Sequence, residues 1–444
     1  MFKFPKGLYT DVRIEKTASA TASYLLGKLD EIKEREIEGA FIRVFDGERW
    51  YYSSTTDLDH VQKHIDRLAK FAKPKKDIDK IPVVEKFPVN TGIHLNFKKK
   101  DISKISLNKK SAMLKAYFPF MKREHIKYWR VYYIDSYIEK RFCSSKGADI
   151  VHDFQKGGFC FIFQMARNER LLTEKYQASS HDFEDLRGHE VRLEHYLKKC
   201  EEFFKNAVPV KPGKYRVIMS PDASGVFAHE SFGHKSEADF MLGDEAMKKE
   251  WTIGKKVSSS ILSIIDDGTL NYSGYAAFDD EGVKTGKTFL IKNGILTGRL
   301  HSCETAAELE EEPTGNARAI SYEFEPIVRM TNTYIAAGKL SKAALFSKVK
   351  DGIFVETIKH GSGMSTFTIA PSISYEVKNG KIGKPLLISV VTGDVFKTLS
   401  LIESVSKKME MMSFVMGGCG KMEQYPLNVG IGGPFVLIKE LNVQ

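Results

Sequence analysis

Cysteine is scarce in this chain and is not arranged in pairs. The 444 residues include five cysteines, an odd number, and no CxxC pair or small-domain disulfide spacing occurs. These absences argue against a secreted domain held together by disulfides and favour reduced thiols in a cytoplasmic protein. The five are Cys143, Cys160, Cys200, Cys303 and Cys419.

Long hydrophobic runs are also absent. No stretch approaches the about 18 consecutive apolar residues that a membrane-spanning helix needs. The first residues, 1–5, lead into charged sequence without the apolar segment of a signal peptide. We therefore expect no membrane partner.

The net charge of +10 is not gathered into a binding patch. Lysine and arginine are scattered, and the short basic runs at 73–76 and 98–100 lack interleaved aromatic residues. No helix-turn-helix, zinc-finger or RRM signature is evident. A basic protein can attract nucleic acid, but this distribution is more typical of solvated loops, so we do not expect a nucleic-acid partner.

The composition is that of a globular protein large enough for two domains. Hydrophobic residues make up 42% and charged residues 28%, and domains usually span about 50–250 residues. The proline-rich stretch at 208–213 suggests a boundary. We predict an α+β protein. Residues 1–207 would form a mixed domain with helices on a sheet, and residues 208–444 a β-rich second domain.

Alternation and turn signals predict the elements of the first domain. Residues 41–45 and 50–52 flank Asp46-Gly47 and predict a hairpin. Helical spacing from Leu58 to Ala72 predicts a helix that begins near Thr56 or Asp57 and ends before Pro74. Residues 74–92 are expected to be a loop or extended connection. Strands are predicted at 128–138 and 159–165, and a second helix over 193–207.

The second domain has one predicted helix near its start. A strand at 215–219 precedes Ser220-Pro221-Asp222, which opens a helix. From about residue 255, short alternating runs are separated by turns such as Asn293-Gly294 and Asn379-Gly380. This pattern predicts an antiparallel, β-rich region.

The predicted helix carries the motif His-Glu-Ser-Phe-Gly-His at 229–234. Residues five apart are separated by about 140° on a regular α-helix, which is poor for sharing one metal. A π-bulge would return His229 and His234 to one face, and Gly233 tolerates such backbone irregularity. The spacing therefore predicts a distorted helix if both histidines bind a metal; the alternative is two unrelated helix histidines.

Glu230 adjoins the first histidine, where a base could take a proton from metal-bound water. A catalytic zinc site usually has three protein ligands, and spacing alone does not choose the third. The candidates for this third ligand are Glu237, Asp239, His301, Cys303, His360 and Cys419.

A second pair of histidines, His60 and His64, also has a spacing that could bind a metal. An amphipathic surface pair is the better interpretation of these two residues.

Several segments together resemble the TldD/PmbA metallopeptidase family, specifically its subunit with the zinc motif. Besides 229–234, the similar segments are 279–282, 313–318, 329–334, 379–383 and Gly-Gly-Cys-Gly-Lys at 417–421. Residues 39–45 resemble the family's N-terminal strand. The resemblance is strong after about residue 215 and weak between about 75 and 185, and the lysine-rich stretch at 71–127 departs from the family pattern.

The resemblance implies a zinc-dependent peptidase acting on small or unfolded peptides. His229, His234 and Cys419 would bind one zinc ion per chain, and Glu230 would activate the zinc-bound water as catalytic base. Family members are dimers, so a homodimer or a heterodimer with a PmbA-type subunit is expected. The strand-rich C-terminal half suggests that an extended peptide binds by adding to a strand edge. Backbone amides near 361–363 or 417–418 could contact the oxyanion, although simple turn geometry is the better explanation of those glycines.

Two other functions compete with this prediction. The first is a non-catalytic, PmbA-like partner subunit, against which the complete set of His229, Glu230 and His234 argues. The second is a nucleic-acid-associated modulator, which rests only on the net charge and on the family's older name as modulators of DNA gyrase.

Overall fold

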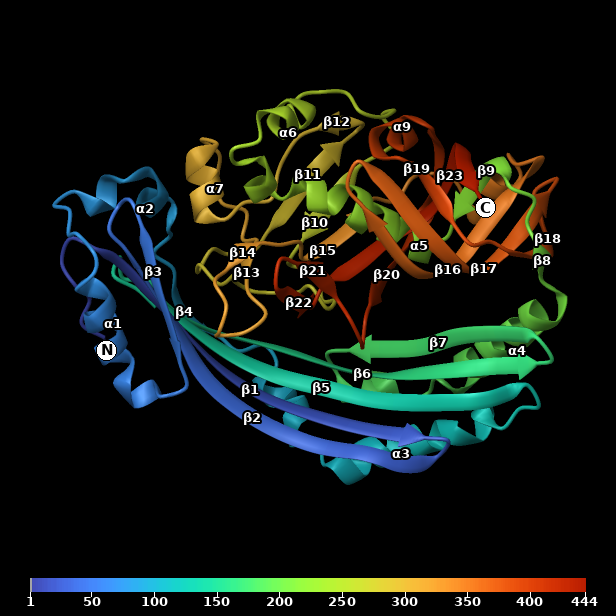
Figure 1. Cartoon of the computed structure of the whole chain (residues 1–444), viewed down its shortest axis with the longest axis horizontal. Coiled ribbons are helices and arrows are strands. Elements are labelled where there is room, and N and C mark those ends of the chain that lie inside the picture. Colours follow the sequence, from blue (N-terminus) through green and yellow to red (C-terminus); the bar gives the residue numbers. More distant parts are fainter. Residues whose placement is uncertain (1) are drawn as a thin grey trace.

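The N-terminal half of the chain builds one long, curved sheet (Figure 1). The structure is a computed structural model and describes residues 2–444. Six strands run in the order β3-β2-β1-β5-β6-β4, and β7 pairs with β6 beyond the end of β4. The strands are β1 (Tyr9–Leu25), β2 (Lys28–Phe45), β3 (Trp50–Thr55), β4 (Thr91–His94), β5 (Ile126–Ser144), β6 (Asp149–Arg167) and β7 (Arg170–Ser180).

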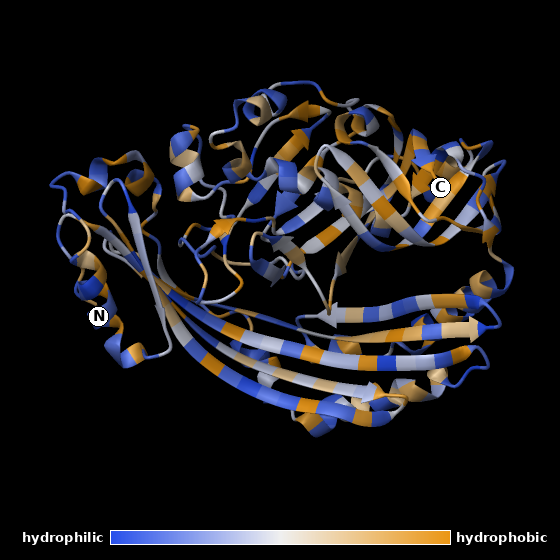
Figure 2. Ribbon diagram, viewed as in Figure 1, coloured by the Kyte–Doolittle hydropathy of each residue, from blue (hydrophilic) through white to orange (hydrophobic). Residues whose placement is uncertain are grey.

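Side chains alternate between the two faces of this sheet, as the period of a β-strand requires. Figure 2 shows the alternation of hydropathy along the long strands. Tyr133 and Phe161 point to one face and are buried against α3 and α4 in a shared core. The opposite face turns toward the C-terminal half of the chain. The helices of this half are α1 (Val61–Ala69), α2 (Pro82–Lys86), α3 (Leu107–Tyr117) and α4 (Glu190–Asn206).

Most predicted N-terminal elements are confirmed. Phe45 pairs with Trp50 across the expected hairpin. Helix α1 lies within the predicted first helix, α4 begins three residues before the predicted second helix and covers all but its last residue, and β5 and β6 contain the predicted strands. The prediction of a loop or extended connection at 74–92 is wrong in part, because helix α2 lies there. The sheet also begins earlier than predicted. The first part of β2, residues 28–38, is highly charged and largely exposed, so it carries no hydrophobic alternation.

The C-terminal half forms a second, 12-stranded sheet. Because β19 pairs with both β17 and β23, strands β23, β9, β16, β17 and β19 form a closed ring of pairings. Helix α5 packs against β23 and β16 of this ring. The strands are β8 (Val208–Pro209), β9 (Gly213–Met219), β10 (Ile264–Asp267), β11 (Lys287–Lys292), β12 (Ile295–Leu296), β15 (Asn332–Ile335), β16 (Asp351–Gly363), β17 (Thr366–Lys378), β18 (Lys381–Leu387), β19 (Val391–Asp394), β20 (Ile402–Ser413) and β23 (Gly430–Val443).

Two small hairpins and short helices complete this half. The hairpins are β13 (Ala317–Arg318) with β14 (Ile327–Val328), and β21 (Cys419–Lys421) with β22 (Gln424–Leu427). The helices are α5 (Pro221–Val226), α6 (Glu245–Glu250), α7 (Cys303–Glu308), α8 (Lys342–Phe346) and α9 (Val395–Ser400). None of the helices in residues 2–444 combines the length and apolar character that crossing a membrane requires.

The C-terminal sheet is mixed rather than antiparallel, which corrects the prediction. Strands β9 and β16 are parallel neighbours, and so are β15 and β23. Parallel neighbours need a long crossover connection, and the crossover from β9 to β16 begins with α5 and the motif at 229–234. Local turn signals such as Asn293-Gly294 and Asn379-Gly380, both with positive φ, reveal hairpins but not crossovers.

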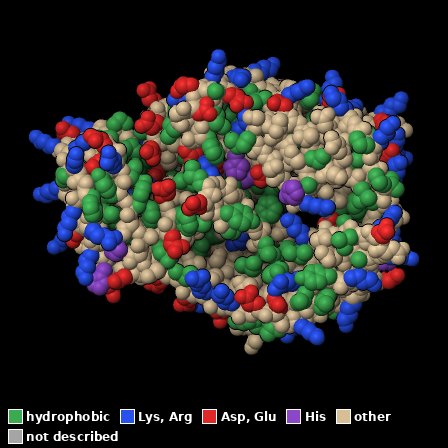
Figure 3. Space-filling model, viewed as in Figure 1, with side chains coloured by type: hydrophobic (Ala, Val, Ile, Leu, Met, Phe, Trp, Pro, Cys, Tyr) green, Lys and Arg blue, Asp and Glu red, His purple; other side chains and the backbone are tan. Residues whose placement is uncertain are grey.

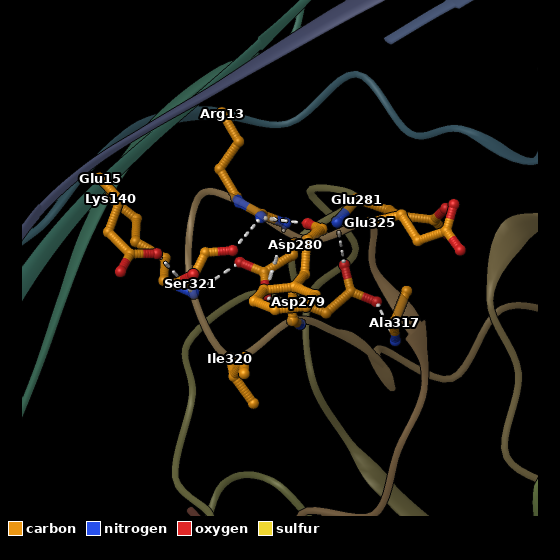
Figure 4. A network of polar contacts seen from close by, with 12 residues as sticks. Arg13, Glu15, Lys140, Asp279, Asp280, Glu281, Ala317, Ile320, Ser321 and Glu325 are labelled. Carbon is orange, nitrogen blue, oxygen red and sulfur yellow. Dashed lines mark hydrogen bonds and ion pairs between the residues drawn. The ribbon is translucent and has the colours of Figure 1, made fainter. Parts of the chain in front are cut away.

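Buried ion pairs join the two halves (Figure 4). Lys140 of β5 lies 2.7 Å from Asp280, and Arg13 of β1 lies 3.8 Å from the same carboxylate. Burial raises the pKa of Asp280, but these two cations outweigh it and hold that pKa well below its ordinary value. Arg43 of β2 pairs with Glu281 at 2.9 Å. The Asp280 carboxylate therefore remains charged, and the ion pairs of Asp280 and Glu281 attach the C-terminal half to the long sheet.

Candidate metal centre

The first candidate histidine, His229, is positioned by a helix that begins directly after β9. The Ser220 hydroxyl accepts a hydrogen bond from the backbone N–H of Ala223 at 3.2 Å, and Pro221 occupies the first helical position. Both residues are typical of a helix start. The prediction of a helix opened by Ser220-Pro221-Asp222 is confirmed.

The helix widens at the motif, as predicted. Helix α5 continues into the π-helix η7 (Phe227–Gly233), followed by the 3₁₀ turn η8 (His234–Ser236). The i→i+5 bonding returns residues five apart to one side of the helix. The ring centroids of His229 and His234 lie 5.2 Å apart.

Gly233 is required for a different reason from the one predicted. Its φ of −56° and ψ of −53° are ordinary helical values, so its backbone does not use the conformational freedom of glycine. A Cβ at this position would lie 2.0 Å from Sδ of the buried Met330. Glycine is therefore needed because the helix approaches the core closely.

Cys419 comes from the β21–β22 hairpin, 185 residues after His234. Gly417 precedes it with a φ of +82°, a conformation that favours glycine. The buried Arg329 donates a hydrogen bond from Nη2 to the carbonyl oxygen of Cys419 at 2.7 Å. The hairpin places Sγ of Cys419 3.5 Å from Nε2 of His234.

His229, His234 and Cys419 form a compact donor set. One potential ligand atom from each residue lies within 4.8 Å of the other two. Tetrahedral zinc, with a Zn–S bond of about 2.3 Å and a Zn–N bond of about 2.05 Å, separates the sulfur and nitrogen by about 3.6 Å. The observed 3.5 Å fits this value. Nδ1 of His229 is buried and has no hydrogen-bond partner among residues 2–444, so the site has an unsatisfied nitrogen that a metal could satisfy.

The three residues perturb one another electrostatically. Burial disfavours the thiolate, but His229 and His234 lower the pKa of Cys419 well below its ordinary value. Burial likewise disfavours the imidazolium, yet Cys419 and Glu237 raise the pKa of His234 to about 11. Thiolate is the form of cysteine that binds metals. Two nitrogen ligands and one thiolate are typical of a zinc site.

Glu230 lies next to this donor set and faces a cavity. Its Oε2 is 4.0 Å from Nε2 of His234, and its side chain is 29% exposed. Gly361 and Gly363 let β16 approach the helix closely: a Cβ on Gly361 would lie 2.5 Å from Cγ1 of Val226, and a Cβ on Gly363 would lie 3.1 Å from the carbonyl oxygen of Glu230. The carboxylate can therefore reach both the metal position and a molecule in the cavity.

The cavity has a volume of about 740 Å³ and lies between the two halves of the chain. Its walls come from β7 of the N-terminal sheet and from β16, β20 and the helix of the C-terminal half. Figure 3 shows this face of the molecule hollowed between the two layers. Besides His229 and Glu230, the lining includes Asp222, Glu174, Tyr196, Gly361, Gly417, Gly418 and Tyr425.

The other candidates for the third ligand lie elsewhere or have other partners. Asp239 pairs with Lys421 at 2.6 Å, and Nε2 of His301 contacts Glu311 at 3.0 Å. Cys303 donates its thiol hydrogen to the carbonyl oxygen of Lys86. His360 lines the cavity on β16. Glu237 lies behind His234, at its Nδ1. Within residues 2–444, the set with Cys419 is the cluster whose geometry suits a metal.

Other sequence candidates have contacts that explain them without a functional role. His60 pairs with Asp57, and Nδ1 of His64 contacts the Ser53 hydroxyl. All five cysteines are free and buried.

Comparison with known proteins identifies the family. The model of the PmbA/TldA metallopeptidase C-terminal domain matches residues 212–444, and that of domain 1 matches residues 10–73. A metalloprotease of Methanocaldococcus jannaschii is 30% identical, with 96% of this chain and 95% of that protein covered. The chain belongs to the TldD/PmbA metallopeptidase family.

Other TldD/PmbA relatives match over the whole chain. A zinc metalloprotease TldD homolog of Saccharolobus solfataricus is 29% identical, with 100% of this chain and 99% of that protein covered. The solved structure of TldE from Thermococcus kodakarensis has a TM-score of 0.75 at 17% identity, covering 98% of this chain and 96% of that one. A Thermotoga maritima protein described as a candidate modulator of a DNA gyrase has a TM-score of 0.79 at 19% identity, covering 99% and 96%. These structures show that the fold is shared and support the α+β class.

Sequence reasoning named Glu237 and Asp239 only as possible metal ligands, and it missed Lys421, Asp222 and Glu174. Glu237 follows His234 by three residues, and Lys421 follows Cys419 by two. That proximity was a signal, but the pairing of Lys421 with Glu237 and Asp239 depends on the tertiary fold. No local sequence pattern marks Asp222 or Glu174, because only the fold brings both residues to the wall of the same cavity.

Proposed function

We propose that this chain is a zinc-dependent peptidase that hydrolyses small or unfolded peptides. The observation that carries the proposal is the position of Glu230, beside the His229, His234 and Cys419 donors and on the wall of a large cavity. A volume of about 740 Å³ falls in the usual range for ligand pockets. It suits a short extended peptide rather than a folded domain.

His229, His234 and Cys419 would hold the zinc ion through two imidazole nitrogens and one thiolate. When bound, zinc supplies Lewis acidity and lowers the pKa of a coordinated water. Glu230 takes the proton from the attacking water and delivers it to the leaving amine, as a general base and then a general acid. Gly361, Gly417 and Gly418 line the cavity. The contact of their backbone N–H groups with the oxyanion stays a prediction.

Strand β7 offers an edge for the substrate. It pairs with β6 on one side, and residues Glu174 to Gln177 of the same strand line the cavity. An extended peptide could hydrogen-bond to this edge through its main chain, which would give broad specificity. Peptides N-methylated at single backbone amides should then be cleaved poorly at nearby bonds. Equal cleavage of methylated and unmethylated peptides would rule out binding by strand addition.

The decisive test compares wild type with Glu230→Gln, which keeps the size of the side chain and removes its basicity. Zinc per chain is counted by elemental analysis, and cleavage of an unstructured peptide mixture is followed by mass spectrometry. Both proteins should bind one zinc, and the variant should be slower by about 10²- to 10⁴-fold, the usual contribution of a general base. Undiminished cleavage by the variant would exclude Glu230 as the base.

Assembly belongs to the same proposal. From the family we expect a dimer, formed either with a second copy of this chain or with a PmbA-type subunit. Peptides would be the substrate in both arrangements. Sedimentation of the purified chain, alone and with a PmbA-type subunit, distinguishes these two arrangements.

A further inference from the structure

Directly behind the metal centre lies a fully buried carboxylate, that of Glu237. Its Oε2 accepts a hydrogen bond from Nδ1 of His234 at 3.2 Å. Nε2 of the same ring faces the Cys419 sulfur at 3.5 Å. The two ring nitrogens therefore have different partners: one faces the carboxylate and the other faces the metal position.

A single lysine connects Glu237 to the hairpin that carries Cys419. Nζ of Lys421 lies 3.1 Å from Oε2 of Glu237 and 2.6 Å from Oδ1 of Asp239. It also donates to the carbonyl oxygen of Val328 at 2.9 Å and lies 4.2 Å from the ring centroid of Phe240. Glu237 and Asp239 follow the histidine helix, whereas Lys421 stands two residues after Cys419 in β21. The ion pairs thus join the two segments that supply the ligands.

We propose that Glu237 is a positioning residue for the metal centre and that Lys421 holds it in place. Glu237 keeps the proton of His234 on Nδ1, so the Nε2 lone pair is directed to the metal. Lys421 compensates the buried charge of Glu237 and fixes the separation between His234 and Cys419. This inference rests on the proposed function, since it assumes that the His229, His234 and Cys419 set binds zinc.

The size of the effect follows from similar arrangements in metalloproteins. Residues that hydrogen-bond to a metal-binding histidine usually change metal affinity by about 10- to 100-fold when they are replaced. Glutamine at position 237 has the same shape but no charge, and its amide group can donate to Nδ1 and stabilise the wrong tautomer. Glu237→Gln should therefore weaken zinc binding without disturbing Glu230.

The experiment measures zinc dissociation constants by competition with a chromophoric chelator for wild type, Glu237→Gln and Glu281→Gln. Glu281 is a matched control, because it is a buried glutamate in an ion pair with Arg43 at 2.9 Å, away from the centre. The expected result is an increase of about 10- to 100-fold in the dissociation constant for Glu237→Gln alone. The absorption bands of the Co²⁺-loaded protein should also shift in Glu237→Gln and stay unchanged in Glu281→Gln.

An affinity for Glu237→Gln within twofold of wild type would overturn the inference while leaving the proposed function intact. Equal weakening in Glu281→Gln would also overturn it, because the effect would then be one of general stability. A wild type that binds no zinc would overturn both proposals.

The crystal structure of zinc-loaded wild type provides a test that does not depend on a variant folding. Zinc on Nε2 of His234, with Nδ1 hydrogen-bonded to Glu237, is the expected result. Zinc on Nδ1, or Glu237 as a direct ligand, would contradict the assignment.

Discussion

Replacing Gly233 by alanine tests how tightly the core constrains the metal-binding turn. The new Cβ would lie 2.0 Å from Sδ of Met330, 3.1 Å from its Cε and 3.4 Å from its Cγ. Met330 is fully buried in the C-terminal core, so it has little space into which to move. Overpacking of this kind costs about 1–3 kcal/mol. Alanine recovers about 0.4–1 kcal/mol, since the backbone is already helical and the unfolded chain becomes less flexible.

The difference between the middle values of these two ranges is about 1.3 kcal/mol, so a net cost of about 1–2 kcal/mol is expected. If the turn keeps its conformation in the variant, the cost appears as a lower free energy of unfolding of the apo protein. If the turn changes its conformation, zinc binding must restore it at the expense of binding free energy. The zinc dissociation constant then rises by about 5- to 30-fold, because 1.4 kcal/mol corresponds to a factor of ten. Urea unfolding followed by tryptophan fluorescence measures the first effect, and chelator competition measures the second.

A second substitution identifies the cause. Met330→Ala alone is destabilising, because it leaves a cavity. In a protein that already carries Met330→Ala, the substitution Gly233→Ala should cause no further destabilisation. The two substitutions should then show a coupling energy of about 1–2 kcal/mol. If Gly233→Ala leaves both stability and zinc affinity unchanged, or if the two substitutions are simply additive, the close approach does not constrain the turn.

Two further predictions concern buried charges. Burial raises the pKa of Asp222 from 3.8 to about 6, although the backbone N–H of Ile358 partly opposes the rise. Protonated Asp222 thus favours the folded state below about pH 4, and this contribution is lost as the pH rises through about 6, a change of at most about 3 kcal/mol. The stability of Asp222→Asn relative to wild type should therefore increase between pH 4 and pH 7.5 in urea unfolding, and a pH-independent difference would refute the assignment. Lys110 and Asp135 form a fully buried ion pair at 2.6 Å, so Lys110→Met should cost about 3–5 kcal/mol by leaving a buried charge unpaired. Lys110→Met combined with Asp135→Leu should recover part of the loss, and no recovery in thermal unfolding would contradict that explanation.

Local sequence patterns were sufficient to predict the part of the site that lies on one helix. The angle of about 140° between residues five apart required a widened turn if the motif binds metal, and η7 is a π-helix. The same reasoning was wrong about Gly233, because its constraint comes from Met330, almost 100 residues later. Steric contacts of that kind depend on tertiary packing, which spacing along the chain does not reveal.

The third donor and the parallel strands could not be derived from local patterns. Cys419 is brought to His234 by a crossover and a hairpin, and spacing alone left five other candidates. Only the resemblance to the family singled out Cys419. The charged half of β2 was missed for a related reason. Its side chains are exposed, so no hydrophobic period marks it, and its strand conformation depends on pairing with β1.

The proposed function requires that His229, His234 and Cys419 together hold a zinc ion. X-ray absorption spectroscopy at the zinc edge measures the ligands of the metal in the wild-type protein loaded with one equivalent of zinc. We expect one sulfur neighbour at about 2.3 Å and nitrogen or oxygen neighbours at about 2.0–2.2 Å. A coordination shell of nitrogen and oxygen alone, without sulfur, would show that Cys419 is not a ligand and would refute the proposed zinc site.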